Sequence, residues 1–192
     1  MDDTCRDISV TCIAPTKTFN LAGLQTAAVY AENSILHHRM WRQLNTDEVA
    51  EPNAFAIQAT IAAFQYGEEW LDELREYVEK NKQYVTEFLQ EKIPLIHPVA
   101  GDATYLMWLD CRKITESGRQ FVKFIRKTSG LYVSGGNQYG RGGEGFLRVN
   151  VATSKLVVED GMQRLYESVD AWLKEEKISK SCLLYTSPSP RD

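Results

Sequence analysis

Apolar residues recur every three or four positions along residues 68–92, and charged residues fill most of the positions between them. This spacing predicts an amphipathic helix of about 24 residues, roughly 36 Å long at 1.5 Å per residue. A helix of this length can leave one domain and enter another. Its apolar positions are Trp70, Leu71, Leu74, Tyr77, Val78, Tyr84, Val85, Phe88 and Leu89.

Beyond this helix the pattern changes to short apolar runs alternating with helical periods. The order strand, helix, strand, strand, helix predicts a small α/β unit of about 80 residues. The expected strands are ATYLMWLDC, LYVSGG and GFLRVNVA, and the expected helices are SGRQFVKFIRKTSG and residues 155–177. The glycine-rich SGGNQYGRGGEG is a loop between two strands. It precedes no helix, so it does not indicate a dinucleotide-binding fold.

The segments before the long helix are less regular. Residues 7–15 have the apolar β-forming residues of a buried strand that ends at Pro15. Residues 21–32 follow Asn20, which can cap a helix, and residues 34–44 predict a second helix. Residues 54–67 are rich in alanine and nearly uncharged, so we expect a helix buried on most sides.

Composition narrows the class of protein. The chain has 192 residues, 43% of them hydrophobic and 25% charged, with a net charge of −4, as in a soluble globular protein. No basic patch indicates nucleic acid, and no apolar run is long enough for a membrane span. The cysteines and histidines have no metal-binding spacing, so we expect no metal. The four cysteines form no CxxC motif and the N-terminus has no pattern of a secretory signal, which together favour the cytoplasm.

Lys17 is the first candidate for chemistry. It follows an apolar segment and stands in a turn before Phe19, so partial burial is plausible. An amine becomes a nucleophile at neutral pH only when desolvation or positive charge lowers its pKa from about 10.4. Spacing alone favours a solvated loop lysine.

Arg148 is the second candidate. It lies within the apolar strand GFLRVNV, where a guanidinium needs a partner. Arginine can grip a carboxylate with two parallel hydrogen bonds, although a structural ion pair would also satisfy it. Tyr139, in the glycine-rich loop, could line a substrate channel or be an exposed loop residue.

These segments together resemble a known family. APTKTFNLAGLQ, around Lys17, resembles the lysine segment of pyridoxal-phosphate enzymes of the class I/II aminotransferase fold, and more narrowly the MalY/PatB group of cystathionine β-lyases. GEGFLRVNVATSK, around Arg148, resembles that group's C-terminal arginine segment. The order, the separation and the intervening residues also match, so the resemblance covers about residues 8–175.

The resemblance implies a fold and a division into domains. The fold is the α/β fold-type I transferase that depends on pyridoxal phosphate, of which this chain would be the C-terminal portion. Residues 1–67 would end the large cofactor domain, 68–92 would form the connecting helix, and 93–178 would form the small α/β domain. Residues 179–192 would be a non-native tail, because CLLYTSPSPRD resembles a translated sequencing adapter; the reading frame would then be cut at both ends.

The resemblance also implies residue roles. Lys17 would form a Schiff base with pyridoxal 5′-phosphate and then act as the base on the substrate Cα. Thr16 could offer the cofactor phosphate a hydroxyl where relatives often have serine, whereas Ala14 cannot. Arg148 would hold the α-carboxylate of a small amino-acid substrate, with Tyr139 near it. The implied reaction is carbon–sulfur β-elimination to pyruvate, ammonia and a thiol, in a homodimer.

Two alternatives stay open. A class I/II aminotransferase would use the same lysine to return the proton to the cofactor. A non-catalytic interaction fragment would keep Lys17 only as a relic. The family's phosphate loop, ring-stacking aromatic residue and ring-nitrogen acid all precede its lysine, and sixteen residues before Lys17 cannot hold them. We therefore expect little lyase activity from this chain alone.

Overall fold

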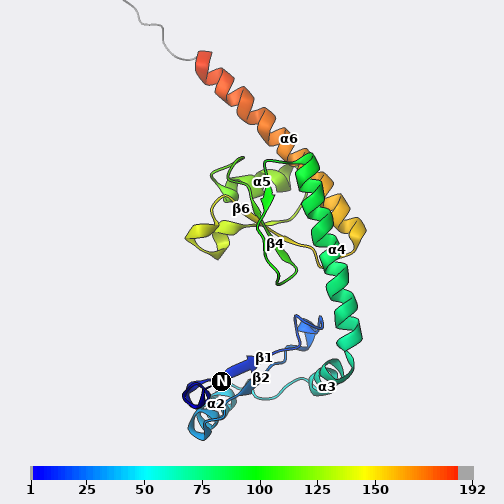
Figure 1. Ribbon diagram of the computed structural model, residues 1–192. Helices are drawn as coiled ribbons and strands as arrows, with labels where there is room; N and C mark the ends of the chain where they lie inside the picture. The colour runs from blue at the N-terminus through cyan, green and yellow to red at the C-terminus, as the bar shows by residue number, and fades with distance from the viewer. Residues whose placement is uncertain (1, 186–192) are drawn as a thin grey trace, which may run out of the picture. The chain divides into compact units, whose positions relative to one another are not determined.

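The computed structural model describes residues 2–185 of the chain, which divides into the compact units Met1–Arg75 and Glu76–Asp192. Each unit mixes helix and strand, in agreement with the expected α/β class (Figure 1). The division falls inside the long helix α4 (Glu68–Lys92). The other elements of the first unit are α1 (Asp3–Ile8), β1 (Thr11–Ile13), η1 (Ala22–Leu24), β2 (Ala28–Tyr30), α2 (Ser34–Thr46) and α3 (Ala56–Tyr66).

The second unit is the more regular one. Its remaining elements are β3 (His97–Pro98), β4 (Leu106–Asp110), α5 (Gly118–Ser129), β5 (Ser134–Gly135), η2 (Gly136–Tyr139), η3 (Arg141–Gly143), β6 (Phe146–Asn150) and α6 (Lys155–Tyr185). The two helices expected in this unit are present as α5 and α6, and α4 has the predicted bounds. The strand expected at LYVSGG is reduced to β5, and β3 was not predicted.

The expected buried strand over residues 7–15 is wrong in length and in burial. Asp2 accepts a hydrogen bond from the Thr4 backbone N–H and begins helix α1, which ends at Ile8, so the strand is confined to β1. β1 pairs antiparallel with β2, with Cys12 opposite Val29. The strand therefore has a partner within the chain, but its side chains stay exposed, with Ile13 51% accessible.

The helix expected over residues 21–32 is also wrong. Only the single turn η1 forms there, and Gln25 ends it in the left-handed region at φ 50°. Asn20 caps no helix with its side chain, since it too has positive φ, at 54°. The residues after Gln25 then pair with β1, because β-branched and aromatic side chains favour an extended backbone when a strand lies beside them.

Helices α2 and α3 form where the sequence predicted them, but α3 is not buried. The Asn33 side chain caps α2 by accepting hydrogen bonds from the backbone N–H groups of Ile35 and Leu36, at 2.8 and 3.1 Å. In α3 only Ala56 is buried. Its large apolar residues keep much of their surface accessible, because the first unit offers no layer to cover them: Ile57 55%, Ile61 44% and Phe64 55%.

The sheet of the second unit is antiparallel throughout, in the order β3-β4-β6-β5. β4 and β6 form its centre (Figure 1), with Leu109 opposite Leu147 and Trp108 opposite Arg148. Successive side chains in a strand point to opposite faces. Leu147 and Val149 are therefore buried on one face, while Phe146 and Arg148 are only half-buried on the other.

The buried face of this sheet belongs to the core. α5 contributes Phe121 and Ile125, α6 contributes Met162 and Leu165, and all four are at most 2% exposed. Full burial of such side chains stabilises the fold by about 1.5–3 kcal/mol each relative to exposure. The other fully buried large apolar residues of this unit include Leu89, Ile96, Leu109, Leu147 and Val151.

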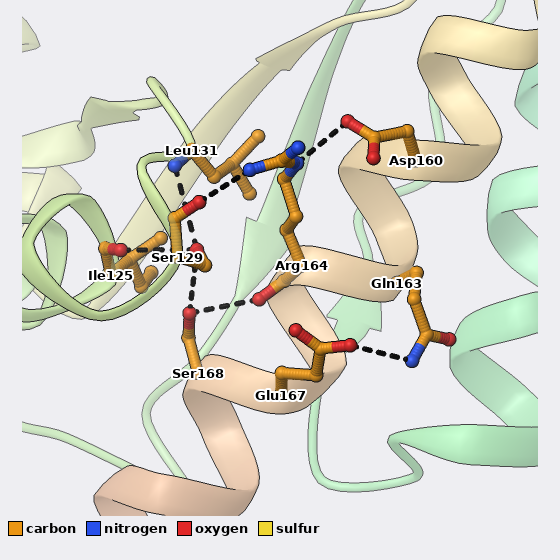
Figure 2. Close-up of polar contacts among 8 residues, drawn as sticks. All are labelled: Ile125, Ser129, Leu131, Asp160, Gln163, Arg164, Glu167 and Ser168. Atoms are coloured by element: carbon orange, nitrogen blue, oxygen red, sulfur yellow. Dashed lines mark hydrogen bonds and ion pairs between the residues drawn. The ribbon is translucent and has the colours of Figure 1, made fainter.

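Hydrogen bonds join α5 to α6 at the end of α5 (Figure 2). Arg164 on α6 donates to the Ser129 carbonyl oxygen at 2.7 Å and to Asp160 at 2.6 Å. The hydroxyl groups of Ser168 and Ser129 lie 2.9 Å apart. Gly130 follows in the left-handed region at φ 73° and ends α5. These contacts satisfy backbone groups that a helix end leaves without partners.

Two side chains of helix α4 form hydrogen bonds with the segment between β6 and α6. Asn81, only 2% exposed, donates from Nδ2 to the carbonyl oxygens of Val151 at 2.9 Å and Thr153 at 3.0 Å. One turn earlier, the Tyr77 hydroxyl accepts from the Lys155 backbone N–H at 2.8 Å, at the start of α6. Two side chains four residues apart thus fix how β6 passes into α6.

Helix α6 extends beyond the expected end near residue 177 and runs to Tyr185. The first residues of the expected tail are therefore helical, and residues 186–192 lie outside the described part. Within the described part, no helix combines the length and the apolar character needed to cross a membrane.

Replacement of Asn81 by alanine should destabilise the second unit. It removes a donor from two carbonyl oxygens, and each buried group left unpaired costs about 1–3 kcal/mol. We expect the free energy of unfolding, measured with urea, to fall by about 2 kcal/mol or more. Lys80→Ala, at an exposed position one residue earlier on α4, is the control and should change it by less than about 0.5 kcal/mol. Equal losses in both variants would contradict this role of Asn81.

Candidate functional site

Lys17 lies on a tight turn that follows β1. The Phe19 backbone N–H donates to the Pro15 carbonyl oxygen at 2.9 Å, and that of Leu21 donates to the Thr16 carbonyl oxygen at 3.0 Å. Asn20, between them, has the positive φ with which many helical turns end, and asparagine is one of the few residues that tolerates it. Asn20 therefore ends the lysine turn rather than beginning a helix.

Phe19 anchors this turn to the helices of its unit. Its ring packs edge-on against Phe64 of α3, with centroids 5.5 Å apart, and lies 6.2 Å from Trp70 at the start of α4. Gly67 lets the ring approach the corner between these helices, since a Cβ there would lie 2.6 Å from a Phe19 ring carbon. The aromatic residue next to the lysine turn thus fixes its place on the unit.

The Lys17 side chain is exposed, so the partial burial expected for it is not found within this unit. Among the described residues it forms no hydrogen bond or ion pair, and the neighbouring Thr16 is half-buried. A cavity of about 320 Å³ lies close by, lined by residues of β1, β2 and α3 and of the segments 25–27 and 49–52, with polar Gln25, Glu51 and Thr60 among them. Ile13 and Pro15 line it, but Lys17 does not.

Arg148 stands in the middle of β6, on the face of the sheet that points away from the core. It lies opposite Trp108 of β4 on one side and opposite Ser134 of β5 on the other. Its partner is an aromatic ring rather than an acid. The guanidinium carbon lies 4.3 Å from the centroid of the Tyr139 ring, and Arg148 has no ion pair with any described residue.

Three aromatic rings lie between two guanidinium groups along this face. The Trp108 ring packs edge-on against Tyr139 and Phe146, with centroid distances of 5.5 and 6.2 Å. The Arg112 guanidinium lies over Phe146 at 4.9 Å. The Trp108 side chain is half-buried, because its position in β4 faces away from Met107 and Leu109.

Arg112 is already paired. It donates to both carboxylate oxygens of Asp110, from Nε at 2.9 Å and from a terminal nitrogen at 2.6 Å. This hydrogen bonding holds the pKa of Asp110 below its ordinary value. The two arginines of this face therefore differ: Arg112 has a carboxylate of the chain on its donors, whereas Arg148 has only a ring on its face.

The glycine-rich loop brings Tyr139 to Arg148. Gly136 and Gly143 approach so closely that a Cβ on Gly136 would lie 2.3 Å from the Gly143 carbonyl oxygen and 2.8 Å from the Trp108 ring. The sequence predicted a loop here but not this contact. It folds the loop back over the sheet, so that Tyr139 reaches Arg148 although it remains 47% exposed.

No metal-binding group of three or more His, Cys, Asp or Glu side chains occurs among the residues that the structure describes. Cys111 is fully buried, and its desolvation raises the pKa of its thiol to about 12, so it is a poor nucleophile at neutral pH. Cys5 and Cys12 are exposed.

The predicted site residues fall into two groups. Thr16 and Lys17 are neighbours in the first unit, while Tyr139 and Arg148 are in contact in the second. Sequence reasoning missed Trp108 and Asn20 as the residues that hold these groups in place. Alternation along β4 could have indicated the first, since Trp108 and Leu109 must face opposite ways.

Gly136→Ala should disturb the loop that carries Tyr139. The new methyl group would meet a backbone oxygen that cannot move away, and overpacking of this kind costs about 1–3 kcal/mol. We expect the free energy of unfolding in urea to fall by that amount. Gly142→Ala, in the same loop with no atom within 4 Å of the new Cβ, should leave it within about 0.5 kcal/mol. The assigned loop conformation is incorrect should both variants prove equally stable.

Comparison with known proteins assigns the chain to a family. Residues 6–165 match the family of class I and II aminotransferases. Cystathionine beta-lyase PatB of Bacillus subtilis (strain 168) is 38% identical over 165 residues, which cover 86% of this chain and 43% of PatB. Protein MalY of Escherichia coli (strain K12) is 30% identical over 156 residues, covering 81% of this chain and 40% of MalY.

A solved structure agrees with these sequence matches. The pyridoxal-phosphate-bound C–S lyase of Staphylococcus hominis has a TM-score of 0.73 and 30% identity, covering 85% of this chain and 42% of that one. The chain thus spans less than half the length of these relatives. The family match nevertheless covers most of its residues, so the chain belongs to the class I and II aminotransferase family.

Proposed function

We propose that this chain is part of a pyridoxal-phosphate-dependent carbon–sulfur β-lyase. The observation that carries the proposal is the exposed Lys17 amine on its fixed turn, within a segment similar to PatB, which is named a cystathionine beta-lyase. The solved relative from Staphylococcus hominis is named a C–S lyase and contains pyridoxal phosphate. Both relatives support a lyase more directly than an aminotransferase.

The residues around Lys17 fit this cofactor. Pyridoxal phosphate is held covalently by a lysine amine, which must be free of any acid, and Lys17 has no ion pair with a described residue. Its turn is fixed at both ends, by the hydrogen bonds of Phe19 and Leu21. Lys17 would hold the cofactor through Nζ, and the neighbouring Thr16 hydroxyl would contact its phosphate.

Arg148 fits the substrate. Its edge donors have no carboxylate partner among the described residues, so they can form two parallel hydrogen bonds with the α-carboxylate of an amino acid. A carboxylate held in this way fixes the rotation of the substrate about Cα. This orientation decides which bond at Cα breaks, and positioning of this kind supplies a large part of catalysis.

The substrate amine would replace Lys17 on the cofactor, and the freed Lys17 Nζ would then take the proton from the substrate Cα. When bound, pyridoxal phosphate supplies the electron sink that makes this proton acidic. The carbon–sulfur bond at Cβ breaks and the electron pair leaves with the thiolate. With one water molecule consumed, the products are a thiol, ammonia and pyruvate. Assembly as a homodimer and a cytoplasmic location complete the proposal.

The product distinguishes lyase from aminotransferase. The protein expressed from its genomic reading frame and loaded with pyridoxal phosphate should release pyruvate and thiol from cystathionine with no added keto acid. Lactate dehydrogenase coupling measures the pyruvate, and a thiol reagent measures the thiol. Amino transfer only when a keto acid is added would establish the aminotransferase instead. If protein that binds the cofactor catalyses neither reaction, both the lyase and the aminotransferase assignments are rejected.

Lys17→Ala tests the attachment of the cofactor separately from turnover. After incubation with pyridoxal phosphate and reduction with borohydride, the wild-type peptide that contains Lys17 should carry the added mass of the cofactor. We expect Lys17→Ala to lose this label and at least about 100-fold in activity. Lys113→Ala, which removes an exposed lysine elsewhere, is the control and should keep both. Labelling spread evenly over exposed lysines would reject Lys17 as the attachment site.

A further inference from the structure

We infer that Tyr139 is a positioning residue: the face of its ring holds the Arg148 guanidinium so that the edge of that group is presented to a carboxylate. The inference rests on the proposed role of Arg148 in binding the substrate. It gives Tyr139 a role other than lining a channel, because its ring is in contact with the arginine itself.

The contact between Arg148 and the Tyr139 ring is not a hydrogen bond, so it leaves the N–H donors of the guanidinium group open. A cation over a ring is attracted through the face of the guanidinium plane, whereas a carboxylate binds along the edge of that plane. The Arg148 guanidinium carbon lies over the Tyr139 ring, 4.3 Å from its centroid, so its neighbour there is the face of a ring and not a carboxylate. Tyr139 can therefore restrain the long arginine side chain without occupying the N–H groups that a carboxylate needs.

Arg112, on the same face of the sheet, shows what happens when the edge is occupied. Its guanidinium also lies over a ring, that of Phe146, at 4.9 Å. Both of its edge contacts, however, are taken by the two oxygens of Asp110. Arg148 also lies over a ring, but it has no carboxylate partner among the described residues. This contrast between neighbouring arginines identifies Arg148 as the one kept available.

The Tyr139 ring is itself held. Trp108 meets it edge-on at 5.5 Å and in turn packs against Phe146, so the ring has an aromatic support on the sheet. The close approach of Gly136 to Gly143 fixes the loop that carries it. A restrained ring reduces the rotamer freedom that the Arg148 side chain would lose on binding a ligand. The ring, not the phenol hydroxyl, supplies this effect.

The test compares three variants by carboxylate binding. The full chain loaded with pyridoxal phosphate is titrated with L-alanine, and with ethylamine as the analogue that lacks the carboxylate. Binding is followed on the NMR signal of the Arg148 Nε–H, assigned by its loss in Arg148→Lys. Tyr139→Phe keeps the ring and should bind L-alanine within about twofold of wild type, while Tyr139→Leu should bind it about tenfold more weakly. The affinity for ethylamine should be the same in both Tyr139 variants as in wild type.

Tyr132→Leu is the matched control. Tyr132 also lies against an arginine, with the Arg126 guanidinium at 4.9 Å from its ring centroid, but it is in the segment between α5 and β5 and is 74% exposed. Its loss should leave the Arg148 titration unchanged. Before any ligand is added, the Arg148 Nε–H signal should show the ring-current shift in wild type and Tyr139→Phe and lose it in Tyr139→Leu.

The outcomes separate the inference from the proposed function. If wild type binds L-alanine at Arg148 and Tyr139→Leu binds it equally well, Tyr139 has no positioning role although the function stands. If the ring-current shift is absent from wild type, the stacking itself is refuted. If wild type shows the shift but no carboxylate response at Arg148, the proposed function fails there, and the positioning role fails with it.

Discussion

The antiparallel pairing of β4 with β6 is the constraint on which the second unit depends. Because side chains alternate between faces, the register that buries Leu109 and Leu147 also places Trp108 opposite Arg148 on the other face. A shift of one residue would send Arg148 into the core, where an unpaired charge is costly, and Leu147 into water. The packing that stabilises the unit and the face that presents Arg148 are therefore set by the same register.

The position of Lys17 also depends on a few specific contacts. The turn has little packing of its own, and Phe19 supplies most of what holds it through its contacts with Phe64 and Trp70. Asn20 completes the turn by accepting a backbone conformation that most residues avoid. The lysine is thus presented by its neighbours in sequence, whereas Arg148 is presented by strands distant in sequence.

The sequence predicted best what local periodicity determines. α4 has a long amphipathic period and was predicted to the residue, and α5 has a serine cap and a glycine end. Burial was predicted poorly, since the apolar residues of α3 can be buried only by a layer that the sequence pattern assumed and the unit lacks. Lys17 and Arg148 were chosen as candidates from motifs. Their surroundings were not, because the Tyr139 contact depends on how two glycines of a loop meet.

The two units differ in how far they stabilise themselves. The second buries large side chains from every layer, such as Leu89, Phe121, Leu147 and Leu165. The described residues of the first bury only Pro15, Ala31 and Ala56 and leave a broad apolar surface in water. Exposed apolar surface on this scale is typical of a surface that packs against other protein. The geometry around Arg148 is therefore supported by the contacts of its own unit, whereas the environment of Lys17 depends on whatever covers the apolar surface beside it.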